Sequence, residues 1–224
     1  MRVAVIAGTP VDTKMGVDFL TAKGVEAFGY PVAQSAQEQV MLQVGSQEEL
    51  EETVGSFLKE IKGQGLNIVM IYCNSLSATI DVEKLAEKFH LHIITPMDAY
   101  GKIAKKYKML GVMAGSNQGL SGIEKTMMNA SNDVFVIGLA SLLLAQGIEA
   151  GIHPEELMET NGLNELVAFF EKNHVEAIVL GCTHFPYLMQ ELSACAAVPV
   201  IDPAEIIYDI IVKTKEGILW TEKE

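Results

Sequence analysis

Ile68-Val-Met-Ile-Tyr-Cys-Asn-Ser75 decides the fold, because the chain repeats it in altered form as Ala177-Ile-Val-Leu-Gly-Cys-Thr-His184. Each stretch is a continuous apolar run, which is typical of a strand buried in a parallel sheet. Each run stops at a cysteine that polar residues follow at once. These cysteines, Cys73 and Cys182, lie 109 residues apart. The repeat predicts two similar structural units.

Two further pairs of segments recur at nearly the same spacing. Residues 3–9 resemble residues 110–116, and residues 94–96 resemble residues 201–203, both with an offset of 107. Three matches in the same order indicate a duplicated unit of about 100 residues, which is a plausible small domain. We therefore expect two lobes, one of residues 1–97 plus 205–224 and the other of residues 98–204.

Short apolar runs alternate with helical patterns along the whole chain. Eight runs predict strands, at residues 3–7, 25–28, 68–72, 93–95, 110–114, 134–137, 177–180 and 198–201. Between them, apolar residues recur at helical spacing, and Ser46 with Glu49 and Ser121 with Glu124 predict helix starts. The alternation predicts an α/β protein whose two pseudo-symmetric lobes each hold a mainly parallel sheet flanked by helices.

Composition limits the class of protein and its partners. The 224 residues are 49% hydrophobic and 20% charged, which argues against a disordered chain or a disulfide scaffold. The net charge of −13 repels phosphate backbones, so we expect no nucleic-acid partner. Three cysteines indicate a reducing compartment, the cytoplasm. The longest apolar run, Val136–Ala145, is too short for a bilayer span, so we expect no membrane partner.

Cys73 and Cys182 are the candidate catalytic residues. In parallel α/β sheets, ligands bind beyond the carboxyl ends of the strands, where both thiols are expected. The alternative for each is a buried cysteine that packs as a small hydrophobe. If the lobes pack face to face, one thiol lies on each wall of a shared cleft. Two opposed thiols suit the inversion of a hydrogen-bearing stereocentre, which needs a base on one face and an acid on the other.

Polar residues beside the thiols are candidate substrate contacts. Asn74, Ser75 and Thr183 could donate to a substrate carboxylate whose charge grows in the transition state. His184 is either an acid/base partner of Cys182 or a local electrostatic influence on it.

Asp12 and Thr13 open the helix after the first predicted strand. Either is a natural N-cap. In the functional interpretation both face the cleft, where Asp12 orients a substrate ammonium or poises Cys73. We expect Lys14 to be a solvated surface lysine.

Two segments that could suggest a cofactor or metal site lack the pattern that such a site requires. Gly115–Gly122 has neither the glycine spacing of a dinucleotide site nor a P-loop lysine. Cys182 and His184 lack further ligands at zinc-site spacing. We expect no cofactor and no metal.

The cysteine segments resemble those of a known family. Leu180-Gly-Cys-Thr-His-Phe-Pro-Tyr-Leu188 resembles the second cysteine motif of glutamate racemases, in the aspartate/glutamate racemase superfamily, and Tyr72–Ser77 resembles the first. The resemblance implies a cofactor-independent racemase, usually a homodimer, whose active site lies between two lobes and acts on an amino acid. It makes Cys73 and Cys182 the acid/base pair. The substrate-contacting or supporting positions become Asp12, Thr13, Asn74, Ser75, Thr183 and His184.

Some segments depart from the family pattern. The Pro-Tyr-Gly substrate loop is absent, and Gly115-Ser116-Asn117 replaces a threonine-bearing loop, which leaves Ser116 as the candidate contact there. His184 favours glutamate over aspartate as the substrate. Three further functions stay open: a racemase of another amino acid or a hydantoin, a non-catalytic binding protein, and a cysteine hydrolase that uses Cys182 and His184.

Overall fold

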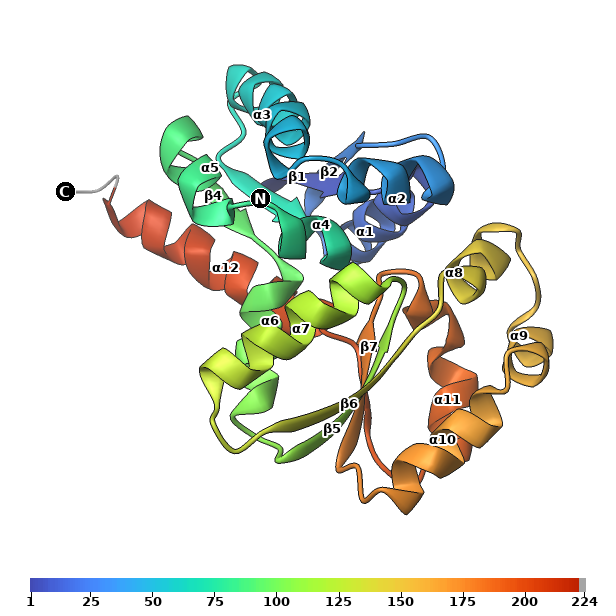
Figure 1. Ribbon diagram of the computed structural model, residues 1–224. Helices are drawn as coiled ribbons and strands as arrows, with labels where there is room; N and C mark the ends of the chain where they lie inside the picture. The colour runs from blue at the N-terminus through green and yellow to red at the C-terminus, as the bar shows by residue number, and fades with distance from the viewer. Residues whose placement is uncertain (222–224) are drawn as a thin grey trace. The chain divides into compact units, whose positions relative to one another are not determined.

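The computed structural model describes residues 1–221, with the side chains at 36, 40, 43, 44 and 217–221 left aside. The chain forms two compact units, Met1–Asp98 with Ala204–Glu224 and Ala99–Pro203. Each unit contains a four-stranded parallel sheet with helices packed around it (Figure 1). The two-lobed α/β fold expected from the sequence is confirmed.

The first unit has the strand order β2-β1-β3-β4. Its strands are β1 Arg2–Ala7, β2 Glu26–Pro31, β3 Ile68–Ile71 and β4 His92–Ile94. Its helices are α1 Pro10–Ala22, α2 Ala36–Val44, α3 Gln47–Gly63, α4 Asn74–Thr79, α5 Val82–Phe89 and α12 Ala204–Thr221, while α6 Pro96–Ala104 crosses into the second unit.

The second unit repeats that order as β6-β5-β7-β8. Its strands are β5 Met109–Ala114, β6 Phe135–Ala140, β7 Ala177–Gly181 and β8 Val200–Ile201. Its helices are α7 Asn117–Ala130, α8 Leu142–Glu149, α9 Pro154–Thr160, α10 Leu163–Lys172 and α11 Met189–Cys195, with the 3₁₀ helix η1 Phe185–Leu188. All eight strands predicted from the sequence are present, with ends that differ by at most three residues.

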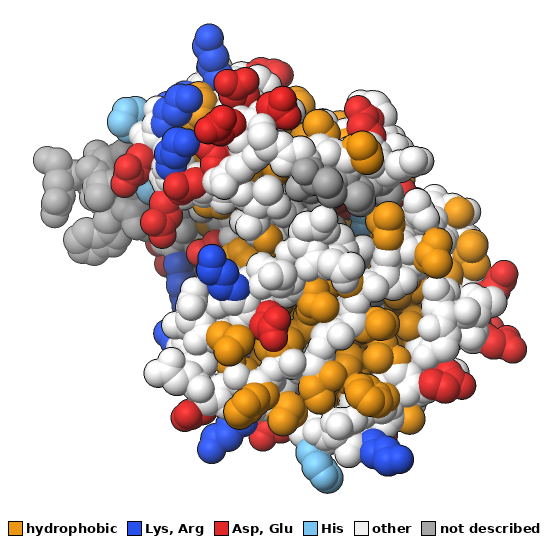
Figure 2. All heavy atoms as spheres, in the orientation of Figure 1, with side chains coloured by type: hydrophobic (Ala, Val, Ile, Leu, Met, Phe, Trp, Pro, Cys, Tyr) orange, Lys and Arg blue, Asp and Glu red, His pale blue; other side chains and the backbone are white. Residues whose placement is uncertain are grey.

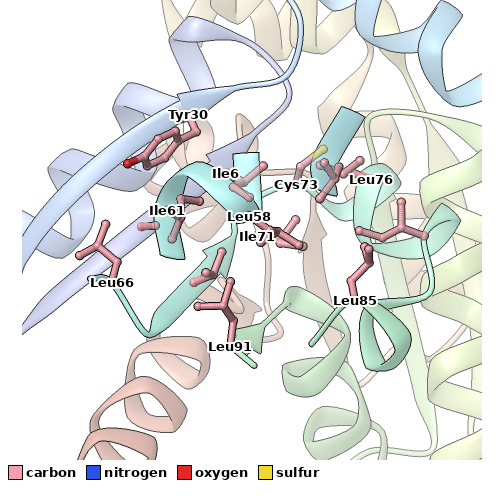
Figure 3. Packing of buried hydrophobic residues seen from close by; sticks show 14 of the residues in the cluster. Ile6, Tyr30, Leu58, Ile61, Leu66, Ile71, Cys73, Leu76, Leu85 and Leu91 are labelled. Carbon is pink, nitrogen blue, oxygen red and sulfur yellow. The ribbon is translucent and has the colours of Figure 1, made fainter. Parts of the chain in front are cut away.

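The apolar face of α3 covers one side of the first sheet (Figure 3). Leu58 and Ile61 are fully buried there, and Phe57 meets the ring of Tyr30 edge-on, with centroids 6.3 Å apart. Ser46 caps this helix as predicted, since its hydroxyl accepts from the Glu49 amide at 3.2 Å. Each fully buried leucine or isoleucine stabilises such a core by about 2 kcal/mol.

One predicted helix start is wrong. Ser121 does not begin a helix, because α7 already starts at Asn117, where the hydroxyl of Ser116 accepts from the Gly119 amide at 3.1 Å. β5 ends at Ala114, so the first extended residue after the turn takes the capping position. Ser121 then lies one turn inside the helix.

The expectation that both faces of every strand are covered is wrong for β6. None of its six residues is buried, and Phe135 is 66% exposed. β6 is the terminal strand of its sheet, so one edge and part of one face stay open. Among the helices that the structure describes, none is long and apolar enough to cross a bilayer.

Candidate active-site residues

Strand order marks one candidate position for ligand binding in each sheet. β1 lies between β2 and β3, so the connections after β1 and β3 leave toward opposite sides, and ligands of open α/β sheets bind beyond the carboxyl ends of such strands. Gly8 and Thr9 follow β1, and Cys73 follows β3. The second sheet repeats the arrangement, with Gly115 after β5 and Cys182 after β7.

Cys73 has apolar neighbours in the core and polar neighbours at its sulfur. It is 3% exposed and belongs to the core cluster of the first unit. Its sulfur, however, accepts a hydrogen bond from Gln39 Nε2 at 2.9 Å and lies 3.6 Å from Ser75 Oγ. In Figure 3 the sulfur points away from Leu58 and Ile71. Packing as a small hydrophobe therefore explains the burial of Cys73 but not the polar neighbours of its sulfur.

Asp12 and Thr13 lie inside α1, so the prediction that one of them is its N-cap is wrong. Thr9 is the cap, because Pro10 fixes the first helical residue and leaves Thr9 extended. The Asp12 carboxylate completes a capping box: it accepts from the Gly8 amide at 3.1 Å, the Thr9 amide at 2.6 Å and the Thr9 hydroxyl at 2.9 Å. Asp12, 1% exposed, thus shapes the turn after β1.

The other candidate residues of the first unit also have local structural roles. Thr13 is buried, and its hydroxyl donates to the Thr9 carbonyl at 2.6 Å. Asn74, also buried, is the first residue of α4. Lys14 is exposed and pairs with Asp18, in agreement with a surface role. Contacts of Asp12, Thr13, Asn74 and Ser75 with a substrate stay predictions.

Cys182 belongs to a chain of three side chains in the second unit. Its sulfur lies 3.6 Å from Nδ1 of His184, and His184 Nε2 lies 3.1 Å from Glu149 Oε1. His184 is 4% exposed, and the Glu149 side chain is 17% exposed. A buried imidazole held at one nitrogen by a carboxylate has a defined orientation, so its other nitrogen can exchange a proton with the thiol.

Sequence patterns do not single out Glu149. It is the last residue of α8 and precedes His184 by 35 positions, so no short motif joins them. The one sequence feature that distinguishes Glu149 is that it is the charged residue at the end of α8, whose other residues are apolar or uncharged. Thr183, which lies between Cys182 and His184 in the sequence, is buried, and Ser116 uses its hydroxyl oxygen to cap α7.

A glycine makes room beside each thiol. A Cβ on Gly115 would lie 2.8 Å from the Cys182 sulfur, and a Cβ on Gly8 would lie 2.1 Å from the amide group of Gln39. Real side chains do not approach so closely, so a side chain at Gly115 would displace the thiol of Cys182, and one at Gly8 would displace the amide of Gln39. Gly8 and Gly115 are equivalent in the internal repeat, which makes close approach to the thiol region a shared feature of the two units.

Cys195 lies away from these clusters, at the end of α11. Its sulfur donates to the Leu192 carbonyl at 3.4 Å. Although the residue as a whole is exposed, desolvation of its sulfur raises the pKa of the thiol, and nearby Glu171 adds to the effect. Over the described part of the chain, His, Cys, Asp and Glu side chains form no group of three suited to a metal.

The sequence of these clusters matches a known family. A model of the Asp/Glu/Hydantoin racemase family matches residues 43–210, three quarters of the chain. The chain belongs to this family. The matched residues of this racemase family member include Cys73, Glu149, Cys182 and His184, whereas Asp12 and Gln39 precede them.

Curated relatives include several glutamate racemases. That of Fusobacterium nucleatum is 30% identical over 151 residues, which cover 66% of this chain and 56% of the relative. That of Limosilactobacillus reuteri is 28% identical over 168 residues, or 73% of this chain and 60% of the relative. The family member described here thus spans somewhat more than half the length of these relatives.

Solved structures share the fold over nearly the whole chain. Glutamate racemase from Francisella tularensis, in complex with D-glutamate, has a TM-score of 0.74 at 17% identity and covers 96% of this chain and 81% of that one. An aspartate racemase homologue from Pyrococcus horikoshii has a TM-score of 0.68 at 13% identity, with 96% and 99% covered. Allantoin racemase from Pseudomonas fluorescens has a TM-score of 0.64 at 17% identity, with 96% and 92% covered.

Proposed function

We propose that this chain catalyses the cofactor-independent racemisation of an acidic amino acid, glutamate in preference to aspartate. Cys73 and Cys182 act as the two acid/base groups at Cα. The observation that carries the proposal is their equivalent position: each thiol follows the third strand of a sheet with the same strand order. Each sulfur also has a hydrogen-bonding side chain beside it. Family membership supports the same reaction.

The proposed reaction moves one proton at each face of Cα. The thiolate on one face removes the Cα proton and becomes a thiol, while the thiol on the other face delivers a proton and becomes a thiolate. The configuration is inverted, and the reverse reaction exchanges the roles. Negative charge develops on the substrate carboxylate in between, and hydrogen-bond donors aimed at it stabilise the transition state. Asn74, Ser75 and Thr183 are proposed for that task.

His184 and Glu149 serve the proton transfer at Cys182. The imidazole lies within reach of the sulfur, and Glu149 fixes the ring and favours its protonated form. This pair can therefore carry the proton that Cys182 gains and loses. The preference for glutamate is supported by His184 and by the named activity of the relatives.

An exchange experiment tests the proposal. The protein is incubated in D2O with each enantiomer of glutamate and of aspartate, and deuterium at Cα and optical rotation are followed. We expect deuterium to enter with inversion, fastest for glutamate. Cys73→Ser and Cys182→Ser should each stop racemisation, whereas Cys195→Ser is the matched control and should not. Full activity in either of the first two variants would exclude the two-base mechanism.

Racemisation of other substrates is a distinct outcome of the same screen. Exchange with a neutral amino acid or a hydantoin, and none with glutamate, would assign the chain to another activity of the family. Substrate binding without any exchange would instead favour a non-catalytic binding protein.

A cysteine hydrolase is the second candidate function, because the contacts around Cys182 also suit nucleophilic catalysis. Thiol, imidazole and carboxylate in series are the arrangement of an activated nucleophile. This function would need Cys182 but not Cys73. Hydrolysis of an activated ester that survives in Cys73→Ser and disappears in Cys182→Ser would support the hydrolase.

A further inference from the structure

Gln39 brings an amide to the sulfur of Cys73 from a distant part of the chain. It lies on α2, 34 residues before the cysteine, and its Nε2 donates to Sγ at 2.9 Å. Residues 43–210 carry the family match, so membership of the family says nothing about this side chain. The contact is therefore argued from the structure of this chain alone.

The surroundings of Gln39 hold its amide in place. One side rests on Gly8, where even a methyl group would collide with all three terminal atoms of the Gln39 side chain. Gln39 also lines a small hollow whose other walls are Gly8, Val32, Leu42, Leu50 and Leu76. Because most of these neighbours are apolar, the sulfur is the natural acceptor for the amide N–H.

The two thiols have chemically different partners. The Nε2 group of a glutamine can only donate, whereas an imidazole nitrogen can donate or accept. A donated N–H interacts more strongly with a negatively charged sulfur than with a neutral thiol. Gln39 therefore favours the thiolate form of Cys73, while His184 can serve both forms of Cys182.

We propose that Gln39 is a positioning residue that holds the sulfur of Cys73 and stabilises its thiolate. Its consequence for catalysis rests on the proposed racemase function, in which Cys73 would then be the base in the resting enzyme. Its effect on the thiol itself does not require turnover. This separates the test of Gln39 from the test of the reaction.

The experiment measures alkylation of Cys73 by iodoacetamide as a function of pH, read by peptide mass spectrometry. Cys182 in the same sample is the internal reference. Gln39→Leu keeps the bulk of the side chain and removes the donor. We expect the midpoint of the Cys73 profile to move to higher pH, with alkylation at neutral pH about tenfold slower relative to the alkaline plateau. The Cys182 profile should not move.

Three variants sharpen the result. Gln37→Leu, an exposed position on the same helix, should leave both profiles unchanged. Gly8→Ala should displace the amide and reproduce the shift of Gln39→Leu. Gln39→Glu replaces the donor by a carboxylate and should shift the Cys73 profile furthest. An unchanged Cys73 midpoint in Gln39→Leu, or an equal shift at Cys182, would overturn the proposal whether or not the chain racemises glutamate.

Discussion

In the proposed reaction, His184 and Glu149 carry the proton that Cys182 gains and loses, and their contact makes a kinetic prediction. His184→Asn keeps a polar side chain but removes the group that titrates near neutrality, so we expect kcat for racemisation to fall by about 100-fold or more with KM little changed. Glu149→Gln keeps a hydrogen bond and loses the charge, so its loss should be smaller. Steady-state kinetics over a range of pH measure both.

Glu155→Gln, an exposed glutamate on α9, is the matched control for Glu149→Gln. Wild-type kcat and an unchanged pH profile in His184→Asn would show that the imidazole takes no part in proton transfer.

The exposure and the surroundings of the three thiols predict the order in which iodoacetamide modifies them. Cys182 is partly exposed and has an imidazole beside its sulfur, whereas Cys73 is 3% exposed. Cys195 is exposed, yet desolvation of its sulfur raises the pKa of the thiol and lowers the fraction of reactive thiolate. We expect iodoacetamide at pH 7 to modify Cys182 first, as a time course of peptide mass spectra would show. Faster modification of Cys195 would contradict this order.

At the residue scale, local patterns in the sequence predict part of each thiol cluster. Cys73 and Cys182 stand at the end of apolar runs, and His184 is two positions from its thiol, so both signals are local. Gln39 and Glu149 reach their partners from helices 34 and 35 positions away. Only tertiary packing brings them there, and no spacing rule in a single sequence encodes it.

At the element scale, hydrophobic runs predict the central strands β1, β3, β5 and β7 well because these strands are buried. Helix starts are predicted less well. The spacing of Ser121 and Glu124 fits a capping box, but the end of β5 decides that Ser116 takes the cap. In α1 the prediction places the cap at Asp12 or Thr13, whereas Thr9 is the cap because Pro10 is the first helical residue.

Glu51 links α3 to the start of α5 and makes a prediction about stability. Its carboxylate accepts from Lys84 Nζ at 2.8 Å, Gln47 Nε2 at 2.7 Å and the Asp81 amide at 3.1 Å. These bonds, the one from Lys84 first, lower the pKa of Glu51 from 4.5 to about 2. A lowered pKa in the folded state means that the contribution is complete above pH 4.5 and is lost as the pH falls toward 2.

Glu51→Gln should therefore lower the free energy of unfolding by about 1–2 kcal/mol at pH 7, and the difference from the wild type should shrink at pH 3. Urea unfolding at the two pH values measures it. Glu52→Gln, at the neighbouring exposed position, is the control and should change stability little. A wild-type value for Glu51→Gln at pH 7 would show that these hydrogen bonds contribute no net stability.

At the scale of the whole molecule, the edge strand β6 is the candidate surface for binding a partner. Phe135-Val-Ile-Gly-Leu-Ala140 contains no charged residue and no proline, the features that normally protect an edge strand. The equivalent strand β2 begins with Glu26, paired with Arg2, and ends with Pro31. Figure 2 shows hydrophobic side chains gathered over the part of the second unit where β6 runs in Figure 1.

The internal repeat shows what covers this face in the first unit. There Tyr30, which corresponds to Leu139, is buried against Phe57 of α3. In the second unit Leu139 is 37% exposed, and Leu143, which follows β6 by three residues, is 75% exposed. An edge strand without charge or proline and with exposed apolar side chains is typical of an interaction surface rather than of a solvated strand.

We propose that a second copy of the chain covers β6, which would form the homodimer that the family resemblance implies. Antiparallel pairing of two β6 edges about a two-fold axis is self-complementary, and it brings an uncharged surface of each acidic copy into contact. Phe135→Lys places a charge on that edge, so sedimentation at micromolar concentration should show a dimer for the wild type and a monomer for the variant. Met128→Lys on α7, 53% exposed, should remain a dimer. A wild-type monomer, or a dimer that survives Phe135→Lys unchanged, would contradict pairing through β6.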